Sequence, residues 1–142
     1  MTNLTLAQSY LVKATKRLKI LPVLLAEDAF SDVVREAQEI VELALKGMLR
    51  YVGVEPPKWH DVGGPLLEFS DRFSREIQEH LPRLADISHW LRKEREFSFY
   101  GDVDFVPTQE YSREDALRAI SDAEFVVRIT TQVVSPGPRG SL

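Results

Sequence analysis

Apolar residues recur at steps of three and four along the first third of the chain, which is the spacing of one buried helical face. The first set predicts a helix from Thr5 to Leu25, and Pro22, which has no backbone donor, is expected to bend its last turn. A second set predicts a helix from Ala29 to Val52 that ends at Gly53. The inward faces of these helices comprise Ala7, Leu11, Ala14, Leu18, Leu21 and Leu25, and then Phe30, Val33, Ala37, Ile40, Val41, Ala44 and Met48.

Three further helices are predicted in the rest of the chain. Pro65 follows a Gly-Gly turn and favours a shorter helix that runs to Gln78. Pro82 suits the first turn of a longer helix to Phe99. Ser112 and Asp115 resemble a capping box and open a last helix to Val134. The inward face of that helix comprises Ala116, Ile120, Ala123, Val127 and Thr130.

No segment has the alternating pattern of a β-strand, so the predicted fold class is all-α. Short connections between long helices favour an antiparallel up-and-down bundle of four main helices plus a short one. The 142 residues fit one domain. We expect residues 1–134 to form it and residues 135–142, rich in Pro and Gly with little apolar surface, to be a flexible tail.

The composition limits the cellular location expected for this domain and the kinds of partner that it can bind. The chain has no cysteine, so neither a disulfide framework nor a thiolate zinc site is available. It has no apolar run of ~20 residues and no secretory signal pattern, which predicts a cytoplasmic protein with no membrane partner. The net charge of -4 gives no general attraction to nucleic acid. Any contact with RNA would therefore have to be local.

An arginine falls on an apolar helical stripe in the segment 82–99. At about 100° per residue, Arg95 lines up with Leu84, Ile87, Ser88 and Leu91, and Arg92 lies on the flank. A guanidinium keeps its proton, so it must meet a carboxylate, a phosphate or held water. Pairing with a neighbouring helix and binding an anionic ligand both satisfy this requirement.

Four segments, taken in order, resemble the HEPN (higher eukaryotes and prokaryotes nucleotide-binding) domain family. They are residues 9–14 (SYLVKA), residues 37–46 (AQEIVELALK), residues 58–63 (KWHDVG), and Arg95 through Tyr100, Gly101 and Asp102. The likeness spans Leu4 to Val134. It implies a helical bundle that commonly forms a homodimer and is often encoded beside a minimal nucleotidyltransferase, as half of a toxin–antitoxin pair. Many relatives are metal-independent ribonucleases.

In those ribonucleases an Arg near the end of a late helix is followed, after a short spacer, by a His, and the dimer joins two such sets in one cleft. Arg95 matches the Arg, whereas Tyr100 stands where the His is expected and no His follows it. A phenol with a pKa near ~10 is about a thousandth ionised at pH 7, so Tyr100 is a poor base. His89, one turn before Arg92, is the better replacement.

The candidate residues form three groups. Those expected to bind a nucleotide or phosphate are Arg92, Arg95, Tyr100 and Asp102, where Asp102 orients Arg95 or the Tyr100 hydroxyl. The candidate catalytic residues are Arg95, Tyr100 and His89. Supporting roles fall to Glu42, expected to pair with Arg95 across the bundle, to Lys46, an i,i+4 partner of Glu42, and to His60, which fixes a turn or donates a proton to phosphate. No zinc-site pattern is present, so neither a metal nor a cofactor is predicted.

Two functions remain at this stage. The first is a nucleotide- or phosphate-binding dimer that acts with a minimal nucleotidyltransferase, and it requires no missing base. The second is an endoribonuclease toxin that cleaves RNA without a metal at Arg95 and Tyr100. In some relatives the partner transferase adenylates a tyrosine near this motif, which gives Tyr100 another role. Apolar residues with no evident place in one core are expected at the two-fold contact: Tyr10, Leu49, Trp90, Phe97 and Phe99. Trp90 lies opposite the inward stripe of its helix, so a place under the long loop is the alternative for it.

Overall fold

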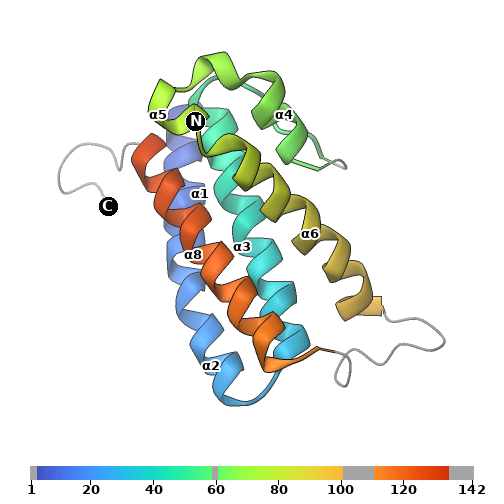
Figure 1. The fold of residues 1–142 in the computed structure, drawn as a ribbon. Helices are drawn as coiled ribbons and strands as arrows, with labels where there is room; N and C mark the ends of the chain where they lie inside the picture. The colour runs from blue at the N-terminus through green and yellow to red at the C-terminus, as the bar shows by residue number, and fades with distance from the viewer. Residues whose placement is uncertain (1–2, 59–60, 101–110, 135–142) are drawn as a thin grey trace.

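The computed structural model describes the backbone of residues 3–58, 61–100 and 111–134 and the side chains of residues 5–58, 61–93 and 111–134. Within these ranges all regular structure is helical, which confirms the all-α prediction. The long helices run alternately up and down, and two short helices cross one end of the bundle (Figure 1).

The first long segment is bent. It consists of α1 (Asn3–Arg17), a 3-10 turn over Leu18–Ile20, and α2 (Leu21–Ala26). Pro22 has no N–H for the carbonyl of Leu18, four residues earlier, and the N–H of Leu21 bonds that carbonyl instead. The predicted bend is therefore present, but it begins one turn before the proline, because the lost hydrogen bond belongs to the preceding turn.

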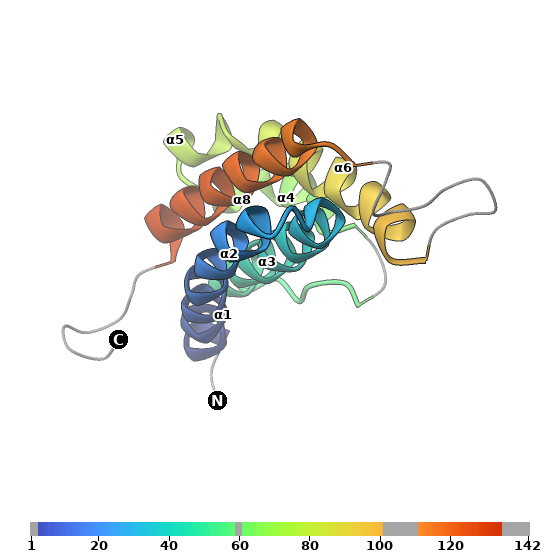
Figure 2. The ribbon, with the colours of Figure 1, turned by 90° about the horizontal axis from the view of Figure 1, so that it is seen from below.

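Helix α3 (Phe30–Tyr51) is the central element. It packs against α1, α6 and α8, as the view from below also shows (Figure 2). The predicted inward face is buried except for the half-buried Phe30, and Val34, Leu45 and Leu49 are buried as well. The expectation that Leu49 lies outside the core is wrong, because a helix surrounded by three others has more than one buried face. Gly53, with a φ of 81°, ends the helix as predicted.

The single helix predicted from Pro65 to Gln78 is wrong. The segment forms α4 (Gly63–Glu68), a 3-10 turn over Ser70–Arg72 and α5 (Arg75–Gln78). The chain is extended at Phe73, whose side chain is buried, and at Ser74, whose Oγ accepts a hydrogen bond from the N–H of Ile77 at 3.4 Å. Burial of Phe73 and a new N-cap at Ser74 therefore outweigh helix continuity.

Helices α6 (Leu81–Tyr100) and α8 (Arg113–Val133) complete the bundle close to their predicted bounds. Ser112 and Asp115 form the predicted capping box. The Asp115 N–H donates to Ser112 Oγ at 3.1 Å, and the Ser112 N–H donates to Asp115 Oδ2 at 2.9 Å. Two of the first amide groups of α8 are thereby satisfied, which fixes where the helix begins.

Trp90 fastens α6 to α8 within one protomer. Its Nε1–H donates to Asp122 Oδ2 at 2.9 Å, and the Arg118 guanidinium lies over its ring at 4.0 Å. An indole that is half-buried and hydrogen-bonded in this way is satisfied without a second subunit. Trp90 therefore does not require the two-fold contact that its sequence position suggested.

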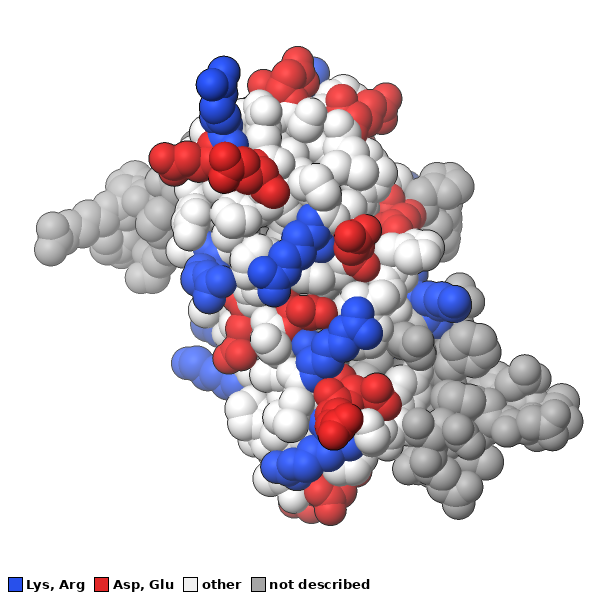
Figure 3. Space-filling view, in the orientation of Figure 1, with Lys and Arg blue, Asp and Glu red and all other residues white. Residues whose placement is uncertain are grey.

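The surface has no large field of one charge on the face seen in Figure 3. Lysines and arginines alternate with aspartates and glutamates along this side of the bundle (Figure 3). This arrangement agrees with the net charge of -4 and directs the search for a site to local clusters. In the described part of the chain, no helix is both long and apolar enough to cross a membrane.

Replacing Gly63 with Ala should destabilise the protein. A Cβ at this position would lie 2.9 Å from Ala85 Cα and 3.0 Å from Ala85 Cβ, so α4 and α6 would have to separate. We expect a loss of about 1–3 kcal/mol in the free energy of unfolding, measured by urea denaturation. Gly64→Ala is the matched control, because nothing lies within 4 Å of a Cβ there. Equal stability of the two variants would contradict this packing.

Candidate phosphate-binding site

The apolar stripe that leads to the predicted arginines is buried as expected. Leu84, Ile87, Ser88 and Leu91 all face the core of the bundle. His89 and Lys93 are exposed on the same helix, and Arg92 is half-buried between them. The backbone of α6 continues through Arg95 to Tyr100, so all five positions belong to one helix.

Several predicted site residues fall where the structure gives no side chain. The side chains of Arg95 and Tyr100 lie outside the described residues, and so do Asp102 and His60 altogether. Their roles stay predictions. The described part of the site is formed by His89, Arg92 and the residues around them.

Asp61 connects the segment after α3 to α6. Its Oδ1 accepts hydrogen bonds from the Gly63 N–H at 2.9 Å and from Ser88 Oγ at 2.7 Å. The first bond satisfies an amide at the start of α4, and the second satisfies a buried hydroxyl of α6. One carboxylate oxygen thus holds the loop against α6, and Oδ2 remains on the side of His89.

His89, Arg92 and Lys93 form a cavity with Asp61. The cavity has a volume of about 320 Å³, and these four are the described residues that line it. His89 Nδ1 lies 3.5 Å from Asp61 Oδ2, while the imidazole is 76% exposed. Among the described residues of the lining, Arg92 and Lys93 carry permanent positive charge and Asp61 carries negative charge, and the charge of Arg92 also acts on the carboxylate of Glu42. The donors of Arg92 and Lys93 match those that bind a phosphate group.

Glu42 lies in the seam between α3 and α6. It accepts a hydrogen bond from Gln38 Nε2 at 2.9 Å, and Lys46 Nζ lies 3.1 Å from its other oxygen. Burial raises the pKa of Glu42. The hydrogen bonds from Gln38 and Lys46 and the positive charges of Lys46 and Arg92 lower it by more than burial raises it, so the pKa of Glu42 lies below 4.5. Glu42 is therefore an anion at neutral pH, held in the field of Arg92.

The predicted pair of Glu42 and Lys46 is thus confirmed, and Arg92 adds positive charge from across the seam. The predicted contact between Glu42 and Arg95 involves a side chain outside the described residues, so it stays a prediction. Gln38 was missed by sequence reasoning. It is 4% exposed and shares a helical stripe with the buried Val34, Val41 and Leu45, so its spacing from these residues is the signal that could have found it.

Asp61 and Lys93 were also missed as site residues. A signal for Asp61 is present in the sequence, because Asp61-Val62-Gly63 before a helix is a typical Asx turn. No local pattern indicates that Ser88 and His89, which lie 27 and 28 positions later in the chain, meet that turn. Only the packing of α4 against α6 brings them together.

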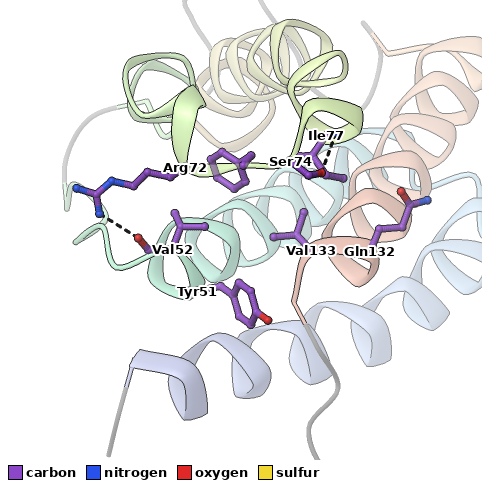
Figure 4. Close-up of a pocket in the computed structure, with 8 residues that line it drawn as sticks. Tyr51, Val52, Arg72, Ser74, Ile77, Gln132 and Val133 are labelled. Atoms are coloured by element: carbon purple, nitrogen blue, oxygen red, sulfur yellow. Dashed lines mark hydrogen bonds between the residues drawn. The ribbon is translucent and has the colours of Figure 1, made fainter.

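A second cavity, of about 220 Å³, lies at the end of the bundle where α3 and α8 finish (Figure 4). Two of its polar side chains, those of Arg72 and Ser74, already have structural roles. Arg72 Nη1 donates to the Val52 carbonyl at 3.0 Å, and Ser74 caps α5. None of the predicted site residues with described side chains lines this cavity. It is therefore a weaker candidate than the cavity on α6.

No cluster of three or more His, Cys, Asp or Glu side chains suited to a metal ion occurs in the ranges with described side chains. Asp61 and His89 are adjacent, but two ligands are fewer than the three or four typical of a zinc site. The described donor set thus matches an anion better than a cation.

The effect of Glu42→Gln on stability should depend on pH. Because the folded-state pKa of Glu42 lies below 4.5, its ionised carboxylate stabilises the protein above pH 4.5, and this contribution is lost as the pH falls through the folded-state value. At pH 7 we expect the variant to lose about 1–2 kcal/mol in the free energy of unfolding. Below pH 4.5 the difference from the native protein should narrow.

Urea denaturation over a series of pH values measures this difference. Glu124→Gln, at an exposed position of α8, is the control and should show little difference at any pH. A gap for Glu42→Gln that stays constant into the acid range would contradict the proposed ionised seam.

Comparison with known proteins gives the family of the chain. The protein named Putative toxin MJ1304, from Methanocaldococcus jannaschii, is 25% identical over 134 residues, which cover 89% of this chain and 87% of that protein. Residues 7–133 match the family model of the HEPN domain. This range contains all of α3, α4, α6 and α8. It also contains the four described residues of the cavity formed by Asp61, His89, Arg92 and Lys93, which we call the α6 cavity. The chain belongs to the HEPN domain family.

Proposed function

We propose that this HEPN protein binds a nucleotide or another phosphate compound at the α6 cavity and acts with a minimal nucleotidyltransferase partner in a toxin–antitoxin pair. The observation that carries the proposal is the cavity of Asp61, His89, Arg92 and Lys93. Arg92 and Lys93 provide charge and hydrogen-bond donors for phosphate oxygens. The volume of about 320 Å³ lies at the lower end of the range for small-molecule sites.

The partner and the biological setting rest on the family and on the relative. A HEPN domain and a relative that is named a toxin support a toxin–antitoxin role for this chain. The minimal nucleotidyltransferase enters through the resemblance of the motifs in residues 9–14, 37–46, 58–63 and 95–102. Modification of Tyr100 by that partner belongs to the same part of the proposal.

We propose that the protein forms a homodimer. Fewer apolar residues are left for a dimer contact in the described structure than the sequence suggested. Leu49 is in the core, and Trp90 is bonded to Asp122. Among residues with described side chains, the exposed large apolar side chains are Ile20, Val23, Leu67 and Leu117. Phe97 and Phe99 lie among the side chains that the structure does not describe. The dimer therefore rests mainly on the family resemblance.

A metal-independent endoribonuclease is the second candidate. His89 beside Arg92 is the observation that favours it, because an imidazole can move a proton and a guanidinium can stabilise charge that develops on phosphate. Arg95 and Tyr100 would then extend the site toward the end of α6. Cleavage would require these residues to move a proton and stabilise developing charge, whereas binding requires only that they hold a phosphate group.

Replacing Arg92 with Ala should weaken phosphate binding. Isothermal titration calorimetry with AMP and with inorganic phosphate measures the dissociation constants. We expect an increase of about tenfold or more in the variant, since a charge-assisted hydrogen bond contributes about 1.5–3 kcal/mol. Arg75→Ala, at an exposed position on α5, is the matched control and should bind as the native protein does. Equal binding by the native protein and Arg92→Ala would place the anion site elsewhere.

Cleavage of RNA by the purified protein decides between the two functions. If binding alone is the activity, RNA should stay intact with or without EDTA. If the chain is a ribonuclease, EDTA should not prevent cleavage, and Arg95→Ala should lower the rate by about a hundredfold or more, as removal of a charge-stabilising donor does in other enzymes. Metal-independent cleavage that is lost in Arg95→Ala would replace our first proposal with the second.

A further inference from the structure

We propose that Asp61 is a positioning residue that holds His89 with its proton on Nδ1, so that Nε2 accepts a hydrogen bond from a ligand in the α6 cavity. The ligand class is a phosphate ester that carries a hydroxyl group, such as a nucleoside monophosphate. The ligand part of this inference rests on the proposed phosphate site, whereas the state of the His89 ring can be measured without any ligand.

The first argument is the anchoring of Asp61. Its Oδ1 is occupied by two donors, the Gly63 N–H and Ser88 Oγ, at 2.9 and 2.7 Å. Ser88 is buried and Gly63 has no room for a side chain beside Ala85, so both donors are fixed by the contact between α4 and α6. The carboxylate cannot turn without losing both bonds. Oδ2 is therefore held in one place.

The second argument is the position of His89 relative to that oxygen. Nδ1 lies 3.5 Å from Asp61 Oδ2, and a carboxylate can only accept. Because Nδ1 is the ring nitrogen near this negative charge, the carboxylate favours the neutral imidazole that carries its proton on Nδ1, which leaves a lone pair on Nε2. This is the role that a carboxylate plays when it fixes the tautomer of a catalytic histidine.

The third argument concerns the ligand. Arg92 and Lys93 line the same cavity and attract the anionic part of a ligand. Nε2 in the Nδ1–H form is an acceptor and needs a donor, which an anion without a hydroxyl group, such as sulfate, does not have. A phosphate ester with a sugar hydroxyl supplies both parts, an anion for the two cations and an O–H group for the imidazole. His89 thereby selects against anions that carry no hydroxyl group.

The test for the tautomer is NMR of protein labelled with 15N-histidine, recorded without ligand at about pH 8.5, above the ordinary range of imidazole titration. His89→Gln assigns the resonances among the three histidines of the chain. We expect the Nδ1–H form in the native protein. In Asp61→Asn the side-chain oxygen can still accept from Gly63 and Ser88, but the amide group would donate to Nδ1, so the ring should change to the Nε2–H form.

A matched control separates this effect from a general disturbance of the loop. Ser88→Ala removes one of the two bonds on Oδ1 but keeps the carboxylate, so the Nδ1–H form should persist. An Nε2–H signal in the native protein would overturn the proposal, and so would an unchanged tautomer in Asp61→Asn. The amide spectrum of each variant shows whether the fold is retained.

The ligand part is tested with AMP and with sulfate, an anion without a hydroxyl group, on the native protein and on Asp61→Asn. Calorimetry should show that AMP binds the native protein more tightly than sulfate does, and that this preference falls several-fold in Asp61→Asn. AMP should also shift the Nε2 resonance of the native protein. A preference unchanged in Asp61→Asn would overturn the ligand selection.

The two failures can be told apart. If neither ligand binds while the Nδ1–H form is present, the phosphate site fails and the positioning role of Asp61 stands. If both ligands bind while the Nε2–H form is present, the phosphate site stands and the positioning role fails.

Discussion

The burial of α3 on several sides is the constraint on which the rest of the structure depends. A helix packed against α1, α6 and α8 has little surface left for polar residues, yet α3 carries Gln38, Glu42 and Lys46 on one stripe. These side chains must therefore find partners within the bundle, and they bond to one another in the seam that α6 covers. The same seam receives the charge of Arg92. The polar site is thus a consequence of how the core is arranged.

Asp61 holds the start of α4 against α6 and lines the α6 cavity with Arg92, the residue whose charge reaches the seam. A loop residue rarely has a fixed position, but this carboxylate is held by the first turn of α4 and by a buried hydroxyl of α6. The site is therefore supported by three elements that are far apart in the chain: α3, the start of α4, and α6. Support of this kind is what a binding site needs if its side chains are to be held ready for a ligand.

The sequence predicted the helices well where hydrophobic periodicity is strong. The bounds of α3, α6 and α8 and the capping box at Ser112 are examples, because each is determined by residues within a few positions. The break at Phe73 was missed because burial of that ring depends on distant partners. Of the candidate site, the positions of His89 and Arg92 on one helix and the pair of Glu42 and Lys46 could be predicted from helical spacing. Asp61 could not, since its contact with α6 spans 27 positions.

The close approach of Gly63 to Ala85 has a mechanical consequence. Gly63 of α4 lies directly against the backbone and methyl group of Ala85 in α6, with no larger side chain between the two helices at this point. Neither helix can therefore slide past the other. Any opening or closing around a ligand must therefore carry α4, Asp61 and this part of α6 together as one rigid block.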